Sequence, residues 1–172
     1  MSETEPGAVP GSTPEHGARA LAALAGFLVL TYAVAAVGAL ASSNAAEVYA
    51  ELDRPVWAPP AWLFGPVWTV LYGTVAVAGW LVWRHTAGRT RRRALTWWGI
   101  QLALNLAWTP LFFGARQYGF ALLDIVLLVA ALLVTIRLFH AGHRVAAYLL
   151  LPYLAWVCFA TVLNAAIWRS NA

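Results

Sequence analysis

The sequence predicts an all-α integral membrane protein built as a bundle of five transmembrane helices. The 172-residue chain is 62% hydrophobic and only 10% charged, whereas soluble domains carry about 25% charged residues. It contains five apolar runs of the length that crosses a bilayer, about 20 residues each. Most of the connections between the runs are short, which favours antiparallel neighbours within one bundle.

The expected elements follow in order along the chain. Segment 1–17 is rich in Pro, Gly, Ser and acidic residues and lacks the basic start and apolar core of a signal peptide. It is expected to be a disordered tail, and 18–172 a single five-helix domain. The helices are expected at about 21–41, 62–83, 94–115, 117–138 and 145–168. Within the apolar cores of these runs the one charged residue is Asp124.

The arginines indicate an orientation, because cytoplasmic loops carry an excess of basic residues. With a cytoplasmic N-terminus, the inner segments hold eight of the eleven basic residues. These are Arg19, Arg84, Arg89, Arg91, Arg92, Arg93, Arg137 and Arg144, against Arg54, Arg116 and Arg169 outside. We therefore expect the long first loop and the C-terminus to lie outside.

Helical phase and depth predict an aromatic pocket in the outer half of the bundle. At about 100° per residue, Trp68 and Tyr72 share one face of the second helix, and Asn105 and Trp108 share one face of the third. The remaining members lie at similar depth on the other helices: Tyr32, Asp124, Trp156, Ala160 and Asn164. Flat apolar ligands fit such a pocket, and the long first loop, which ends in the proline-stiffened segment 57–62, is the expected lid.

Each of these features also has a simpler interpretation. Tryptophans near an interface are often membrane anchors, and Asn105 and Asn164 can bond helix to helix. Asp124 is costly in a membrane and is expected to face the interior or a cavity, as a structural bond or a ligand contact. The small residues Gly99, Ala103 and Ala107 form a stripe that predicts either a homodimer interface through the third helix or packing within the bundle.

Several function classes have no support in the sequence. The single cysteine, Cys158, cannot form an internal disulfide, and no Cys/His metal spacing occurs. There is no Gly-rich phosphate loop, Ser/His/Asp set or HExxH motif. Three histidines fall at expected helix ends, so none is placed to hold a haem iron between helices. The arginine cluster marks a loop and does not predict a nucleic-acid partner, and no metal site is expected.

Three long motifs resemble the TspO/MBR family of tryptophan-rich sensory proteins and animal translocator proteins. They are RPVWAPPAWLFGPVWTVLY from Arg54, LALNLAWTPLFFGARQYGFALLD from Leu102, and PYLAWVCFATVLNAAIWRSN from Pro152. The resemblance covers 49–171 and implies a five-helix bundle, often dimeric. It implies protoporphyrin IX or haem as the ligand with no required cofactor, and a bacterial member in the cytoplasmic membrane.

The resemblance also implies particular site residues and shows departures. It assigns Trp68, Asn105, Trp108, Trp156, Ala160 and Asn164 to the ligand pocket, adds Phe120, Leu127 and Leu163, and assigns Trp57 and Trp62 to the lid. Phe120 stands where animal relatives carry tryptophan, and Ala58 replaces a histidine. The segment LNAAIWR lacks the tyrosine of the proposed sterol motif, a weak pattern even when intact, so sterol binding is not expected.

Three functions follow as hypotheses. The favoured one is a membrane-embedded tetrapyrrole-binding sensory or regulatory protein. The second is an enzyme that degrades protoporphyrin IX in light, with Trp68 and Trp156 as the candidate catalytic residues because indole rings are electron-rich. The third is a porphyrin transporter, which the sequence supports less because it shows no helix-pair repeat.

Overall fold

The part of the chain that the structure describes folds into helices joined by turns and one longer loop. The computed structural model describes residues 14–171, and no strand occurs among them. The long helices are α1 (Pro14–Ala41), α3 (Phe64–His85), α4 (Gly88–Thr109), α5 (Tyr118–Gly142) and α7 (Leu151–Asn171). Shorter elements join them: α2 (Ala45–Glu51), a 3-10 turn (Ala61–Leu63), a π-helical turn (Pro110–Gly114) and α6 (Arg144–Leu149). The predicted all-α class is confirmed.

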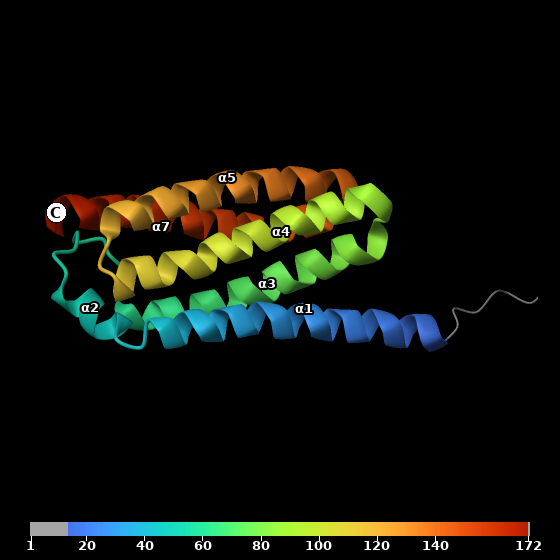
Figure 1. Cartoon of the computed structure of the whole chain (residues 1–172), viewed down its shortest axis with the longest axis horizontal. Helices are drawn as coiled ribbons and strands as arrows, with labels where there is room; N and C mark the ends of the chain where they lie inside the picture. Colours follow the sequence, from blue (N-terminus) through green and yellow to red (C-terminus); the bar gives the residue numbers. More distant parts are fainter. Residues whose placement is uncertain (1–13, 172) are drawn as a thin grey trace, which may run out of the picture.

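Four segments of the described chain are long and apolar enough to cross a membrane. They are Gly17–Ala41, Ala61–His85, Tyr118–Gly142 and Arg144–Asn171. Helix α4 has 22 residues, as many as α3, but its first turns contain the arginines of 89–93, which lower its apolar content. It nevertheless lies between α3 and α5 in the bundle (Figure 1).

Some helix boundaries differ from those expected. Helix α1 begins at Pro14, so 14–17 is helical although the sequence assigns it to the tail; residues 1–13 of that tail lie outside the described residues.

Helix α4 begins at Gly88, before the expected 94, and the α-helical geometry ends at Thr109. Pro110 has no N–H for the regular bond, and the chain continues as a wider turn in which Ala115 N donates to Pro110 O at 2.8 Å.

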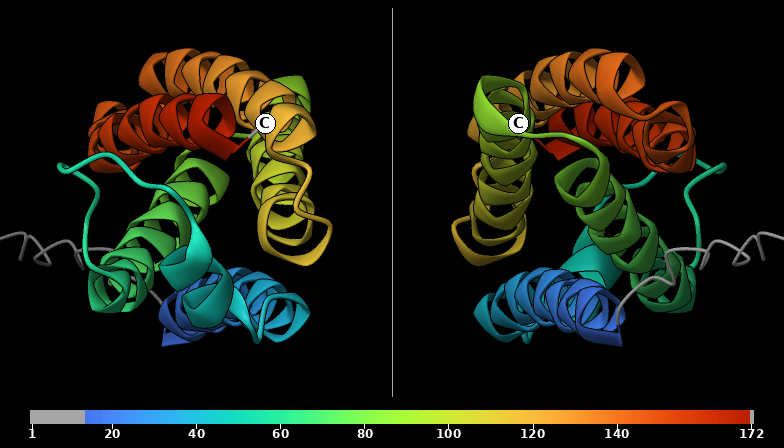
Figure 2. Two further views of the ribbon diagram at one scale, coloured as in Figure 1. Left: turned by 90° about the vertical axis from the view of Figure 1, so that its left-hand side faces the viewer. Right: turned by 90° about the vertical axis from the view of Figure 1, so that its right-hand side faces the viewer.

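Helices α3, α4, α5 and α7 surround the main core, and α1 packs along the edge formed by α3 and α4. Figure 2 shows α1 on the opposite side of the bundle from α5. Buried side chains between the four helices include Val75, Leu102, Leu132 and Val157. Close packing in this core fixes which face of each helix points inward. The core therefore positions the residues of the site.

Gly79 allows α3 to approach α4 closely. A Cβ atom at this position would lie 2.9 Å from the Trp98 ring and 2.9 Å from Phe27. The Trp98 indole is thereby placed against the α3 backbone, where its Nε1 donates to Val75 O at 3.0 Å. This contact joins α1, α3 and α4 below the cavity described next.

Candidate functional site

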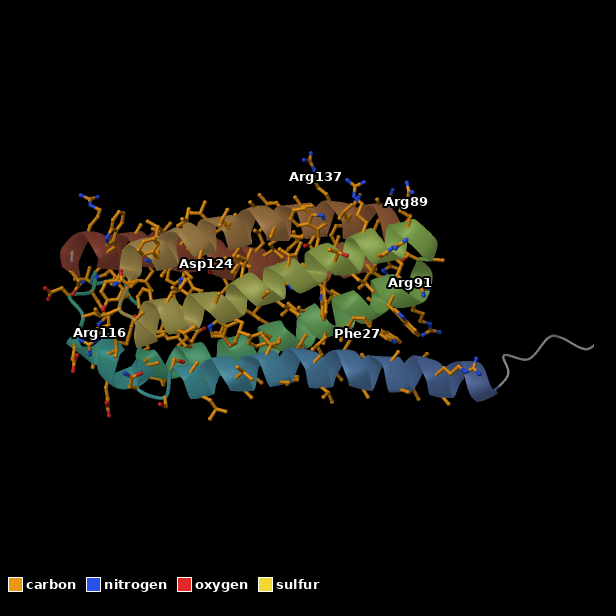
Figure 3. All side chains as sticks on the ribbon, viewed as in Figure 1. Phe27, Arg89, Arg91, Arg116, Asp124 and Arg137 are labelled. Carbon is orange, nitrogen blue, oxygen red and sulfur yellow. The ribbon has the colours of Figure 1, made fainter. Side chains whose placement is uncertain are left out.

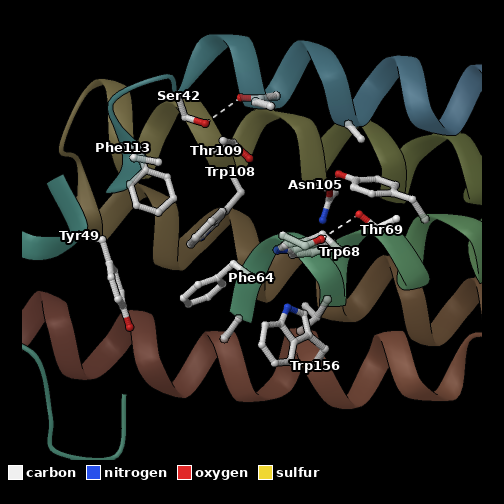
Figure 4. Close-up of a pocket in the computed structure, with 18 of the residues that line it drawn as sticks. Ser42, Tyr49, Phe64, Trp68, Thr69, Asn105, Trp108, Thr109, Phe113 and Trp156 are labelled. Atoms are coloured by element: carbon white, nitrogen blue, oxygen red, sulfur yellow. Dashed lines mark hydrogen bonds between the residues drawn. The ribbon is translucent and has the colours of Figure 1, made fainter. Parts of the chain in front are cut away.

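A cavity of about 540 Å³ opens between α1, α3, α4, α5 and α7, with α2 at one end. Its wall is predominantly aromatic and small (Figure 4). The aromatic lining residues are Tyr32, Tyr49, Phe64, Trp68, Tyr72, Trp108, Phe113 and Trp156. Small residues complete it, including Ala35, Gly38, Ala39, Gly65 and Ala160. Because the small side chains leave space between large rings, the cavity can accept a flat ligand.

The rings of the wall support one another by edge and tilted contacts. The Trp68 ring centroid lies 5.5 Å from that of Tyr72 and 6.0 Å from that of Tyr153. Phe64 meets Trp156 edge to face at 5.8 Å. Such geometries are favourable for aromatic pairs, so the rings are held in fixed orientations at the edge of the cavity.

Hydrogen bonds fix the polar side chains near the wall. Tyr72 Oη donates to Asn105 Oδ1 at 2.5 Å, which joins α3 to α4. Tyr32 Oη donates to Thr69 O at 2.9 Å, which joins α1 to α3. The Trp156 Nε1 atom is buried and has no hydrogen-bond partner among the described residues. None of the lining residues is charged, so the site suits a ligand that is mainly apolar.

Asn164 supports the cavity from behind Trp108. Its Oδ1 accepts from Trp108 Nε1 at 3.0 Å, and its Nδ2 donates to Tyr118 O at 2.9 Å. One amide therefore connects α7 to both ends of the α4–α5 turn. A buried side chain with two such partners is expensive to replace, so Asn164 positions the Trp108 ring although it does not line the cavity.

Asp124 lies inside the bundle but not on the cavity wall. The side chain is buried, and its Oδ2 has no hydrogen-bond partner within the described residues. Its neighbours Ile125 and Leu128 do line the cavity, and Figure 3 shows Asp124 between the helices. The expectation that this carboxyl faces the interior agrees with its burial, whereas direct ligand contact at the wall does not follow from its position.

Helix α2 lies at the end of the cavity and the loop 52–60 follows it; we call these two segments the lid. The buried Tyr49 side chain lines the cavity and donates from Oη to Pro59 O at 2.8 Å. The Arg54 guanidinium carbon lies 4.4 Å from the centre of the Tyr49 ring. Burial raises the pKa of the Tyr49 phenol, and the Arg54 charge opposes part of that rise. The phenol therefore stays neutral and continues to donate its bond at neutral pH.

Two further contacts fasten the lid to the ends of other helices. Asn171 at the end of α7 holds the Asp53 peptide at both sides: Asp53 N donates to Oδ1 at 3.1 Å, and Nδ2 donates to Asp53 O at 3.0 Å. Arg116, in the α4–α5 turn, pairs with Glu51 at 3.0 Å. These contacts join segments that are far apart in the sequence.

The structure brings about half of the expected pocket residues to the cavity wall. Those that line it are Tyr32, Trp68, Tyr72, Asn105, Trp108, Trp156 and Ala160. Those that do not are Trp57, Trp62, Phe120, Asp124, Leu127, Leu163 and Asn164. Phe120 and Leu127 lie on the outward face of α5, 65% and 50% exposed, and Leu163 packs in a second core cluster. Trp62 is 72% exposed, and Trp57 contacts Phe159 at the surface of the lid.

Some lining residues were not expected from the sequence. Tyr49 lies in the expected first loop, and Phe64 lies at the start of the expected second helix, where it was not assigned to the pocket. On the α1 side, small lining residues follow helical spacing: Ala35, Gly38 and Ala39 in the helix, and Ser42 directly after its end. That i, i+3, i+4, i+7 pattern of small residues is a signal that could have identified this face.

The described residues contain no cluster suited to a metal ion, and the stripe expected at a dimer interface lies partly at the surface of α4. No group of three or more His, Cys, Asp or Glu side chains is placed to hold a metal ion within residues 17–171. On α4, Ala103 is exposed, and a Cβ atom added to Gly99 would meet nothing within 4 Å. Ala107 is half-buried. The stripe of Gly99, Ala103 and Ala107 thus faces outward in part, and its pairing with a second subunit remains a prediction.

The fold and the site define a helical integral membrane protein with an aromatic cavity between its helices. A sequence profile of the TspO/MBR family matches residues 27–169. The human translocator protein is 46% identical over 125 residues, covering 72% of this chain and 74% of the human protein. The tryptophan-rich protein TspO of Archaeoglobus fulgidus is 40% identical, covering 72% of this chain and 80% of its own. A tryptophan-rich sensory protein of Cereibacter sphaeroides is 35% identical over 145 residues, covering 84% and 89%. The chain belongs to the TspO/MBR family.

Proposed function

We propose that this protein binds a tetrapyrrole such as protoporphyrin IX or haem in the aromatic cavity, as a membrane-embedded sensory or regulatory protein. The observation that supports this is the cavity of about 540 Å³ with three tryptophans and no charged residue in its wall. Flat rings gain both apolar burial and ring contacts in such a site. In this proposal α4 is the fifth membrane-spanning helix, and the cavity lies in the outer half of the bundle.

The wall suits the macrocycle itself rather than a bound metal. It contains no His, Cys or Met as an axial ligand to iron. Its tyrosines, Tyr32, Tyr49 and Tyr72, each donate their hydroxyl to another protein group. Haem and the metal-free porphyrin are therefore expected to bind through the same ring contacts. Because no cation lines the wall, the carboxylates of the ligand are expected to remain at the solvent edge of the cavity, where they keep their hydration.

Titration of the purified protein with protoporphyrin IX tests this proposal. We expect saturable quenching of tryptophan fluorescence together with a shift of the porphyrin absorption band. The double substitution Trp68→Phe with Trp156→Phe should weaken binding by about 1–3 kcal/mol, or roughly 5- to 150-fold in Kd. The matched control, Trp97→Phe with Trp168→Phe, also removes two indoles but none from the cavity wall. Equal affinity in both variants would contradict the proposal.

Light-dependent breakdown of protoporphyrin IX is a second candidate function. The observation that favours it is the presence of both Trp68 and Trp156 on the cavity wall, next to any bound porphyrin. Illumination of the complex in the presence of dioxygen should then give a product that free porphyrin does not give. The double variant Trp68→Phe with Trp156→Phe should lose that product at porphyrin concentrations that still saturate the site. If the protein only binds porphyrin, the illuminated complex should give the same product as illuminated free porphyrin.

A further inference from the structure

The two ends of the bundle differ in charge. Arginines gather where α3 meets α4 and where α5 meets α6, and Figure 3 shows Arg89 and Arg91 at that end and Arg116 at the other. We call the side chains Arg84, Arg89, Arg91, Arg92, Arg93, Arg137 and Arg144 the arginine surface. Within residues 17–171, the acidic side chains lie elsewhere: Glu47, Glu51 and Asp53 are near the lid, and Asp124 is inside the bundle.

The charges of the arginine surface are not neutralised by ion pairs within residues 17–171. The one ion pair among those residues joins Arg116 to Glu51 at the other end. Every member of the arginine surface is exposed except Arg91, which is half-buried. A concentration of uncompensated guanidinium groups creates a positive potential that attracts an external anion.

Tryptophans hold two of these guanidinium groups in place. The Arg84 guanidinium carbon lies 5.4 Å from the centre of the Trp80 ring, and that of Arg91 lies 5.5 Å from the centre of the Trp83 ring. Arg91 Nε also donates to Thr86 O at 2.7 Å. A guanidinium group positioned in this way loses less conformational entropy when its remaining N–H groups bind an anion.

We propose that the arginine surface binds the headgroups of anionic phospholipids in the leaflet that it faces. Two observations favour a lipid over a soluble anion. The helices that carry the surface belong to an integral membrane protein. Trp80 and Trp83 lie beside the arginines, and tryptophan rings are enriched where a membrane protein meets the lipid headgroups. Arginine binds phosphate through paired N–H groups, and clusters of four to eight basic residues beside a membrane span select anionic lipids.

Quenching by brominated lipids tests this proposal on the full chain in vesicles. Brominated phosphatidylglycerol or phosphatidylcholine quenches tryptophans at the protein surface, so the ratio of their association constants measures lipid preference. The wild type should prefer phosphatidylglycerol, and each arginine removed from the arginine surface should reduce that preference by up to about five-fold. High salt should reduce it as well.

A matched pair of variants separates the surface from net charge. Arg91→Gln with Arg92→Gln and Arg93→Gln should lose the preference, whereas Arg54→Gln with Arg116→Gln and Arg169→Gln removes the same charge at the other end and should keep it. Equal association constants in the wild type, or equal preference in the two variants, would overturn the proposal. Full competition by soluble glycerol 3-phosphate would also overturn it, in favour of a small-anion site. These outcomes do not depend on what the cavity binds.

Discussion

Replacing Asn171 with alanine should release the lid while leaving the helical bundle intact. The Asn171 side chain makes two hydrogen bonds to the Asp53 peptide, at 3.1 and 3.0 Å. Each contributes about 1 kcal/mol, and less where water competes, so their loss should favour lid opening by about 1–2 kcal/mol. That corresponds to an opening equilibrium about 5- to 30-fold larger.

Hydrogen exchange measures this opening without any ligand. The Ala58 amide donates to Pro55 O at 2.9 Å within the lid, so its exchange rate reports opening of the loop rather than loss of the Asn171 contact itself. We expect about 5- to 30-fold faster exchange at Ala58 in Asn171→Ala. Exchange in the core of α4, for example at Leu102, should be unchanged.

The ion pair between Arg116 and Glu51 also holds the lid and is expected to contribute less than the Asn171 hydrogen bonds. Arg116 and Glu51 have side chains that are 55% and 62% exposed, and exposed pairs contribute about 0–1 kcal/mol. Glu51→Gln should therefore accelerate exchange at Ala58 by less than about five-fold. If Glu51→Gln opens the lid as much as Asn171→Ala, or if neither changes exchange, the ranking of these contacts is wrong.

Two further predictions concern helix packing. Gly79→Ala should destabilise the protein by about 1–3 kcal/mol, because the new methyl group would lie 2.9 Å from the Trp98 ring; Gly99→Ala, which meets nothing within 4 Å, should be neutral or slightly stabilising, and thermal unfolding in detergent distinguishes the two. A double-mutant cycle of Tyr72→Phe and Asn105→Leu should give a coupling of about 0.6–2 kcal/mol for their 2.5 Å bond. A coupling near zero would show that the bond contributes nothing to the packing of α3 on α4.

The helices themselves could be predicted largely from local composition. A run of about 20 apolar residues becomes a helix in a membrane because every backbone polar group must be satisfied within the segment. The boundaries were less accurate where polar residues continue a helix, as in the arginine-rich start of α4 at Gly88. The π-helical turn at Pro110–Gly114 was not predicted, although a proline at that point signals an interrupted hydrogen-bond pattern.

Periodicity identified which residues share a face but not always which face points inward. It grouped Trp68 with Tyr72 and Asn105 with Trp108, and all four lie on the cavity wall. The assignment of Phe120 and Leu127 came from resemblance, and the structure turns both outward. The rotation of α5 about its axis depends on its packing against α4 and α7, which is information that one helix sequence does not contain.

The sequence by itself determined the membrane class, the approximate helices and the aromatic character of the site, because these depend on local composition and period. Only the tertiary structure decided the cavity, since its wall combines residues of α1, α2, α3, α4, α5 and α7. It likewise decided that Asn164 acts through Trp108, and that Asn171 fastens a lid 118 residues away. Contacts at such separation arise when helices pack, and their partners follow from geometry in three dimensions rather than from spacing along the chain.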